Sequence, residues 1–143
     1  MTNRNAGLQL RLRRAKRQIG IQHEHLRSLY VSLADCIAKG RTAQVQDVAR
    51  QLLGAMEAHF SLEDGVFFPA VYGLHPDRAR DLNELMREHE KYRSLLVRLC
   101  EDLTAGGLEA FAKGYQEFSA SIADHEDREE RLIDLLTEEP SDE

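Results

Sequence analysis

The sequence contains few of the residues that characterise disulfide-rich and β-sheet proteins. Its 143 residues include two cysteines, no tryptophan and only 6% aromatic side chains. The two cysteines, Cys36 and Cys100, are not arranged as CxxC, which excludes a disulfide framework and a cysteine zinc site. Aromatic residues are enriched in strands, so their scarcity disfavours a β-sandwich or a β-barrel.

Long hydrophobic runs and an excess of positive charge are also absent. No apolar run approaches the ~20 residues of a transmembrane helix, and residues 1–8 lack the apolar segment of a secretory signal. The 25 acidic and 19 basic residues give a formal net charge of -6, which disfavours a phosphate backbone as the main partner. We therefore expect a cytoplasmic protein that binds neither membrane nor nucleic acid, with a frayed acidic tail at 138–143.

Helix-breaking residues are grouped, and they divide the chain into four helical segments. Prolines and glycines gather near positions 40, 69–76 and 106–107. Between them, apolar residues recur three and four positions apart among good helix formers. We predict an all-α fold, an up-down-up-down antiparallel four-helix bundle that forms one domain over residues 1–143. Thr42 is expected to cap the second helix, and Pro76 to stand in the first turn of the third.

An internal repeat relates the two halves of the chain. Residues 23–33 match residues 89–99 at seven of eleven positions. The same shift along the sequence carries His59 onto His125 and Glu63 onto Glu129. Each half therefore has one histidine on its first helix and a His-x-x-x-Glu pair on its second.

The four repeated histidines are predicted to lie at one level of the bundle and to face its interior. The midpoints between successive histidines fall at positions 41, 74 and 107, close to the breakers that mark the turns. Each histidine also continues the apolar stripe of its own helix. The stripe that accompanies His59 comprises Leu52, Met56, Leu62 and Val66.

Six polar side chains in the core of a bundle predict a metal centre. Buried imidazoles and carboxylates are costly without compensation, which bound metal would supply. The alternatives are a buried network of His–Glu hydrogen bonds, or histidines close enough to a bundle end to be hydrated. Four imidazoles and two carboxylates suit two divalent ions with bridging carboxylates, iron first and manganese or zinc next. Ferritin-like bundles use Glu-x-x-His, which this sequence lacks.

The pattern H…HxxxE…H…HxxxE, with HFSLEDGVFFP at residues 59–69, resembles the hemerythrin-like (HHE cation-binding) domain over about residues 15–138. The resemblance implies a non-haem centre of two iron ions, oxo- or carboxylate-bridged. It implies that Glu63 and Glu129 bridge the ions and that the terminal ligands are His23, His59, His89 and His125. Members of the family bind O2, respond to NO or peroxide, or sense iron.

The sequence departs from the oxygen-carrying hemerythrins at two positions. Those proteins have HxxxH on the third helix and HxxxxD on the fourth, whereas this chain has Arg93 four residues after His89 and no aspartate at the required step after His125. The symmetric pattern of four histidines and two glutamates is associated instead with NO, peroxide and redox-stress chemistry.

The remaining candidate residues are interpreted as structural. We expect His25 on the surface, His75 solvated in a turn, and both cysteines as small buried hydrophobes. Tyr30 and Tyr92 are expected in the core, where either phenol could approach the metals.

Three functions are compatible with these residues. The first, which we favour, is a protein that binds or reduces a small oxidant (O2, NO or peroxide) at the two irons, with turnover in the case of an oxidoreductase. The second is a sensor or store of O2, redox state or iron without turnover. The third is a structural bundle without metal. The sequence identifies no protein partner.

Overall fold

The computed structural model describes residues 2–137, and these form helices and short turns without a strand. The helices are α1 (Thr2–Ala38), α2 (Thr42–Leu62), α3 (Phe68–Leu74), α4 (Ala79–Gly106) and α5 (Leu108–Thr137). A π-helical turn at Glu63–Phe67 joins α2 to α3, and a 3-10 turn at Pro76–Arg78 precedes α4. The predicted all-α fold is confirmed. The acidic tail at 138–143 lies outside the described residues.

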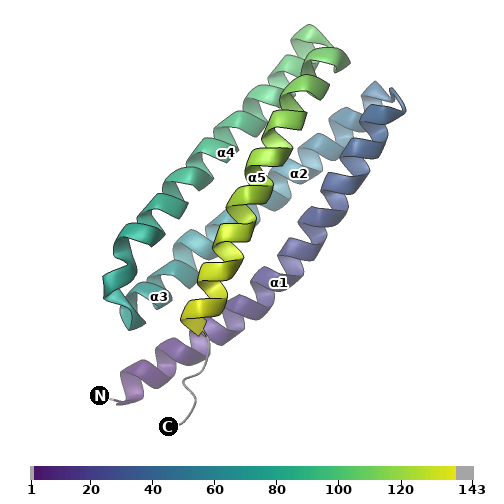
Figure 1. Ribbon diagram of the computed structural model, residues 1–143. Coiled ribbons are helices and arrows are strands. Elements are labelled where there is room, and N and C mark those ends of the chain that lie inside the picture. The colour runs from purple at the N-terminus through teal and green to yellow at the C-terminus, as the bar shows by residue number, and fades with distance from the viewer. Residues whose placement is uncertain (1, 138–143) are drawn as a thin grey trace.

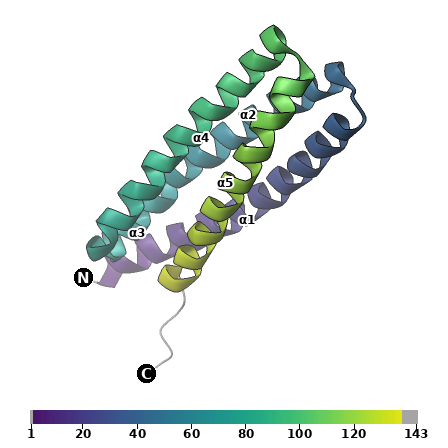
Figure 2. The ribbon, with the colours of Figure 1, turned by 45° about the horizontal axis from the view of Figure 1, so that its top comes forward.

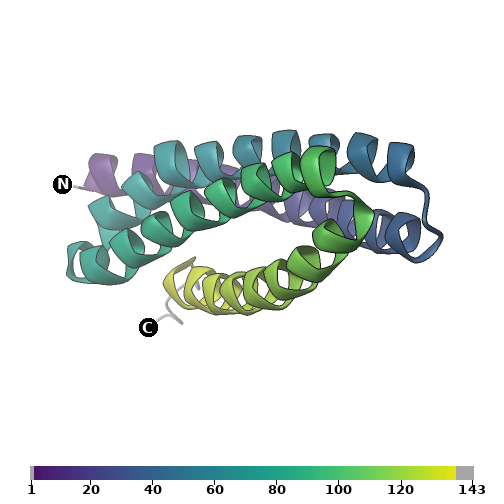
Figure 3. The same ribbon diagram turned by 90° about the horizontal axis from the view of Figure 1, so that it is seen from above.

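The four long helices lie side by side, and the chain reverses direction between them (Figure 1). Helix α1 packs along α2, and α4 packs along α5, while contacts of α2 with α4 and of α1 with α5 close the arrangement (Figure 2). The first turns of α1 and the last turn of α5 therefore lie at the same end of the molecule (Figure 3). None of the helices within residues 2–137 combines the length and hydrophobicity of a membrane span.

Two glycines with positive φ form the turns at the opposite end. Gly40, at φ 67°, ends α1 in a Schellman motif, in which Arg41 N–H donates to the Cys36 carbonyl at 3.1 Å. The chain passes directly from this motif into α2, so Arg41 is the N-cap residue and makes no side-chain cap bond. The prediction that Thr42 caps α2 is wrong by one residue. Gly107, at φ 87°, alone separates α4 from α5.

The π-helical turn changes the inward face of the second segment. Phe68 N–H bonds to the carbonyl of Glu63, five residues earlier, and Pro69 has no N–H with which to continue an α-helical pattern. The extra residue in this turn places Phe67 in the core, 1% exposed, and leaves Val66 38% exposed. The sequence prediction, which continued an α-helical period through this segment, wrongly placed Val66 inside.

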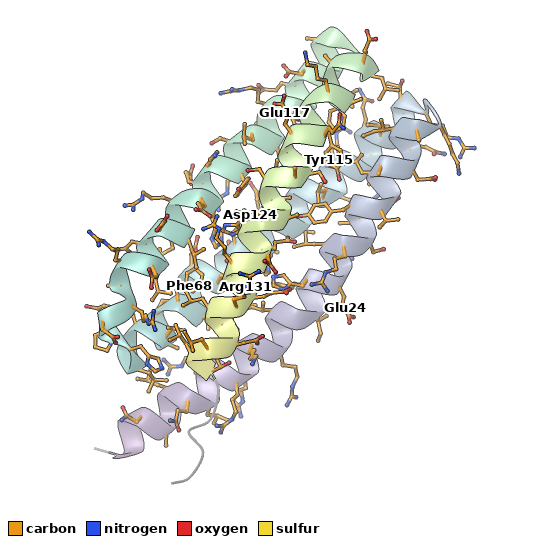
Figure 4. The ribbon with its side chains drawn as sticks, in the orientation of Figure 1. Glu24, Phe68, Tyr115, Glu117, Asp124 and Arg131 are labelled. Carbon is orange, nitrogen blue, oxygen red and sulfur yellow. The ribbon has the colours of Figure 1, made fainter. Side chains whose placement is uncertain are left out.

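Two apolar clusters make up the core, and a polar layer lies between them. One cluster runs toward the Gly40 and Gly107 turns and includes Leu33, Leu52 and Phe111. The other lies toward the chain ends and is built largely from α1, α3, α4 and α5. Charged side chains such as Glu24 and Glu117 lie on the outside of the helices, whereas Tyr115 lies between α5 and α1 (Figure 4).

Candidate metal centre

The polar layer consists of the six residues that the repeat singles out. They come from α1, α2, the π-helical turn, α4 and α5, and each is at most 6% exposed. Their side chains meet in two groups, within each of which one ligand atom from every residue lies within 4.8 Å of the others. The first group is His23, His59, Glu63 and Glu129, and the second is His89, His125 and Glu129.

Glu129 presents a different oxygen to each pair of histidines. Its Oε1 lies 3.8 Å from Nε2 of His23 and 3.9 Å from Nε2 of His59. Its Oε2 lies 2.9 Å from Nε2 of His89 and 3.4 Å from Nε2 of His125. The carboxylate therefore stands between one histidine pair from each half of the chain.

Glu63 has a similar position between the two halves. Its Oε2 lies 3.2 Å from Nε2 of His59, one helical turn before it. Its Oε1 lies 3.2 Å from Nε2 of His89 on α4. Each carboxylate thus offers one oxygen to each half.

Several polar atoms in this layer have no hydrogen-bond partner among the described residues. They are His23 Nε2, both oxygens of Glu63, His125 Nε2 and Glu129 Oε1. Buried polar atoms without partners are rare and costly, and all of these belong to the six converging residues. Neutral imidazole nitrogens and carboxylate oxygens are donor atoms for first-row transition metals, so the residues present fit a metal centre.

The Nδ1 atoms of His59 and His125 are hydrogen-bonded to side chains from their own half of the chain. Gln22 Oε1 accepts from Nδ1 of His59 at 2.8 Å. Glu88 Oε1 accepts from Nδ1 of His125 at 2.6 Å. Gln22 and Glu88 are themselves equivalent positions of the repeat, which therefore extends to the residue before each first-helix histidine.

The remaining two histidines are held across the halves. Asp64 Oδ1 accepts from Nδ1 of His89 at 2.8 Å, and Glu130 Oε2 lies 3.3 Å from Nδ1 of His23. Asp64 and Glu130 are again equivalent positions of the repeat. We call Gln22, Asp64, Glu88 and Glu130 the outer acceptors. A hydrogen bond at Nδ1 leaves the lone pair of Nε2 directed at the centre, which is the usual arrangement around metal-bound histidine.

The sequence was compared with models of known protein families. Residues 16–134 match the model of the hemerythrin HHE cation binding domain. The chain belongs to the hemerythrin family. No curated protein and no solved structure gave a significant match. The family is a cation-binding one, and the clustered histidines and glutamates of this chain lie within the matched residues.

The ionisable groups of this hemerythrin domain are strongly perturbed by their surroundings. Burial lowers the pKa of His59 to about 3, so its imidazole is neutral. Burial would also lower the pKa of His89, but its hydrogen bonds to Asp64 and Glu129, together with the nearby Glu63 carboxyl, raise it to about 11. In the metal-free domain His89 therefore carries a second ring proton directed at the carboxylates.

The two central carboxyls behave as a coupled pair. Burial and the neighbouring charge of Glu129 raise the pKa of Glu63 well above its usual value. Burial would raise the pKa of Glu129 too, but polar contacts with Glu63 and the surrounding histidines hold it well below its usual value. The two carboxyls therefore do not ionise independently, and a proton is held more firmly on Glu63 than on a carboxyl in water.

The two sides of the centre have different surroundings. Phe60 stacks on the His89 ring with centroids 4.1 Å apart, and Phe68 stacks on it at 5.8 Å. On the side of α1 and α5, the Tyr30 hydroxyl donates to Glu126 Oε2 at 3.1 Å. A pocket of about 320 Å³ on that side is lined by Tyr30, Glu126 and Glu130, among others.

The other candidate residues lie outside the cluster. His25 is exposed on α1, as predicted. The Tyr92 ring packs on His125, and its hydroxyl donates to the Ser121 carbonyl at 2.9 Å rather than reaching the centre. Cys36 is buried, as predicted, whereas Cys100 is only half-buried.

His75 departs from the sequence prediction. It is half-buried rather than solvated, because its Nε2 lies 3.2 Å from the Leu136 carbonyl of α5. The outer acceptors were not among the residues predicted from the sequence. Their signal was available, since each one adjoins a predicted ligand and recurs at the equivalent position of the repeat.

Proposed function

We propose that this hemerythrin domain is an antiparallel four-helix bundle that holds two iron ions in its core and binds or reduces a small oxidant there. Glu63 and Glu129 are proposed as bridges. His23 and His59 would hold one ion, and His89 and His125 the other. The observation that carries the proposal is that each carboxylate presents one oxygen to each histidine pair.

The donor set supports iron before other metals. Imidazole and carboxylate together suit iron, with manganese or zinc as secondary choices. When bound, iron would supply open coordination positions and the ability to exchange electrons with O2, NO or peroxide. The chain's own residues orient the donors through the outer acceptors, and Phe60 and Phe68 exclude water beside His89.

We propose that the small ligand approaches the centre from the Tyr30–Glu126 side. The pocket there lies between α1 and α5 and is lined by Glu130, which also contacts His23. A diatomic or similarly small molecule fits a pocket of about 320 Å³. We propose that the small oxidant is the binding partner of the domain. We also propose that the domain is located in the cytoplasm.

Metal analysis of the anaerobically reconstituted protein tests the proposal. The folded chain is expected to bind about two irons and to show the near-ultraviolet bands of a bridged ferric pair after oxidation. Glu63→Ala and Glu129→Ala are each expected to lose the paired centre, because removing one bridge leaves two cations with less negative charge between them. A folded chain that retains one iron or none would contradict the proposal.

Turnover distinguishes the two metal-dependent functions. An oxidoreductase consumes many equivalents of peroxide or NO for each centre when a reductant is supplied. A sensor or store takes up its ligand only once for each centre. Steady-state consumption by the loaded protein, with the Glu129→Ala variant as the control, measures the difference.

A further inference from the structure

The outer acceptors follow the repeat in position but not fully in chemistry. Asp64 and Glu130, which hold the histidines across the halves, are both carboxylates. At the other repeat-related position, the second half has the carboxylate of Glu88 and the first half has the neutral amide of Gln22. The centre is therefore symmetric in its six converging residues and asymmetric one layer further out.

Glu88 differs from Gln22 in charge and also in having a basic partner. Arg128 Nη2 donates to Glu88 Oε1 at 2.8 Å, the same oxygen that accepts from His125. Glu88 and Arg128 therefore form an ion pair beside the His125 ring. The position equivalent to Arg128 in the first half of the repeat is Leu62, so Gln22 lacks both the charge and the ion pair.

The acceptor behind a ligating histidine changes how strongly that histidine binds metal. A carboxylate on Nδ1–H makes the imidazole a better donor at Nε2 than a neutral amide does, because the bond is charge-assisted. Removal of such outer partners commonly changes metal affinity by about 10- to 100-fold. A difference of this size between His125 and His59 would separate two otherwise equivalent sites.

We propose that the two ion sites are unequal, and that the site of His89 and His125 fills first because carboxylates hold both of its histidines. The site of His23 and His59 fills second because Gln22 holds one of its histidines without charge. The inference rests on the proposed function, since it requires that the layer binds metal. The central carboxylates do not separate the sites, because each offers one oxygen to each half.

Stepwise loading with Zn²⁺ alone tests the order. Ring-nitrogen NMR of the folded protein reports each histidine separately, and Zn²⁺ is diamagnetic. With one equivalent of Zn²⁺, the Nε2 signals of His89 and His125 are expected to shift while those of His23 and His59 stay in place. The second equivalent is expected to move the remaining pair.

Exchange of the two outer acceptors tests the cause. Glu88→Gln keeps the hydrogen-bond acceptor and removes the charge, and it is expected to weaken the first site by about 10- to 100-fold in competition with a chelator. Gln22→Glu is expected to strengthen the second site by a similar factor. The double exchange is expected to reverse the order in which the histidine signals move.

Asp124→Asn provides the matched control. Asp124 also pairs with Arg128, at 3.1 Å, but its side chain is 72% exposed on the outside of α5 (Figure 4) and it bonds no histidine. Loss of its charge is expected to leave both affinities and the order of loading unchanged. A comparable effect in this variant would show that general surface charge, and not the bond to His125, governs loading.

Two results would contradict the inference in distinguishable ways. If two equivalents bind but all four histidines respond together, or His23 and His59 respond first, the sites are not ordered as proposed and the proposed metal centre stands. If neither Zn²⁺ nor iron binds to the folded chain, the proposed function fails and the inference fails with it.

Discussion

At the scale of single residues, two histidines separated by two positions have opposite environments. His23 is 6% exposed, and its Nε2 lies 3.8 Å from Glu129 Oε1. His25 is exposed on the other side of α1. Two residues along an α-helix correspond to a rotation of about 200°, so only one of them can face the centre.

His23→Ala is therefore expected to lose or strongly weaken one of the two metal ions and to change the optical spectrum. His25→Ala is expected to keep both ions, and its free energy of unfolding should stay within about 0.5 kcal/mol of wild type, as is usual for surface changes. Metal analysis and denaturant titration of the pair measure both effects. The opposite assignment of phenotypes would show that α1 presents His25 to the centre.

At the scale of helices, two glycines inside helices have different surroundings. Gly54 of α2 is exposed, and a Cβ there would meet no other atom within 4 Å. A Cβ at Gly114 of α5 would collide with Leu99 Cδ2 of α4. Leu99 is buried at 7% exposure, so a side chain at Gly114 would have to displace Leu99 from its packed position.

Gly54→Ala is expected to stabilise the domain by about 0.5–1 kcal/mol, because alanine restricts the unfolded chain and favours the helix. Gly114→Ala has the same benefit, but it is expected to destabilise the domain by about 1 kcal/mol net because Leu99 must leave its packed position. Urea unfolding of the metal-free variants gives both values. Equal stabilisation by the two substitutions would show that α4 and α5 do not pack as closely as described.

At the scale of the whole molecule, protons and metal compete for one buried layer. The layer lies between two apolar clusters, and the side chains of the described residues leave several of its polar atoms without a hydrogen-bond partner. Burial and the charge of Glu129 raise the pKa of Glu63, and the surrounding carboxylates raise the pKa of His89, so both groups favour their protonated forms in this layer.

Metal affinity is consequently expected to rise with pH through the neutral range. The pKa of His89 is raised to about 11, so below that pH its Nε2 proton must leave before the nitrogen can bind metal. The raised pKa of the Glu63 carboxyl acts in the same direction. Affinity should increase by about tenfold per pH unit for each proton released.

Calorimetry of Zn²⁺ binding in buffers of different ionisation enthalpy measures this proton release. The His25→Ala variant serves as the control, because it keeps all six converging residues and removes only an exposed imidazole. An affinity that stays constant between about pH 6 and 8 would show that the layer is already deprotonated in the metal-free domain.

Periodicity and repetition in the sequence were sufficient to predict the helices and the six converging residues. An amphipathic stripe determines which residues a helix buries, and equal distances from the turns determine which residues meet. His23, His59, His89 and His125 could therefore be chosen over His25 and His75 without coordinates. The same reasoning failed at Val66, because a local rule assumes an uninterrupted helical period and the π-helical turn adds a residue to it.

Only the tertiary structure decided what surrounds these six residues. The hydrogen bonds from His89 to Asp64 and from His125 to Glu88 join separate helices, and a one-dimensional pattern does not specify which neighbouring side chain reaches a given ring nitrogen. The sequence repeat alone predicted that the two halves contribute equivalent histidines and glutamates. The difference between Gln22 and Glu88 became meaningful only when packing placed each against the Nδ1 of a buried histidine, where a single charge is poorly screened.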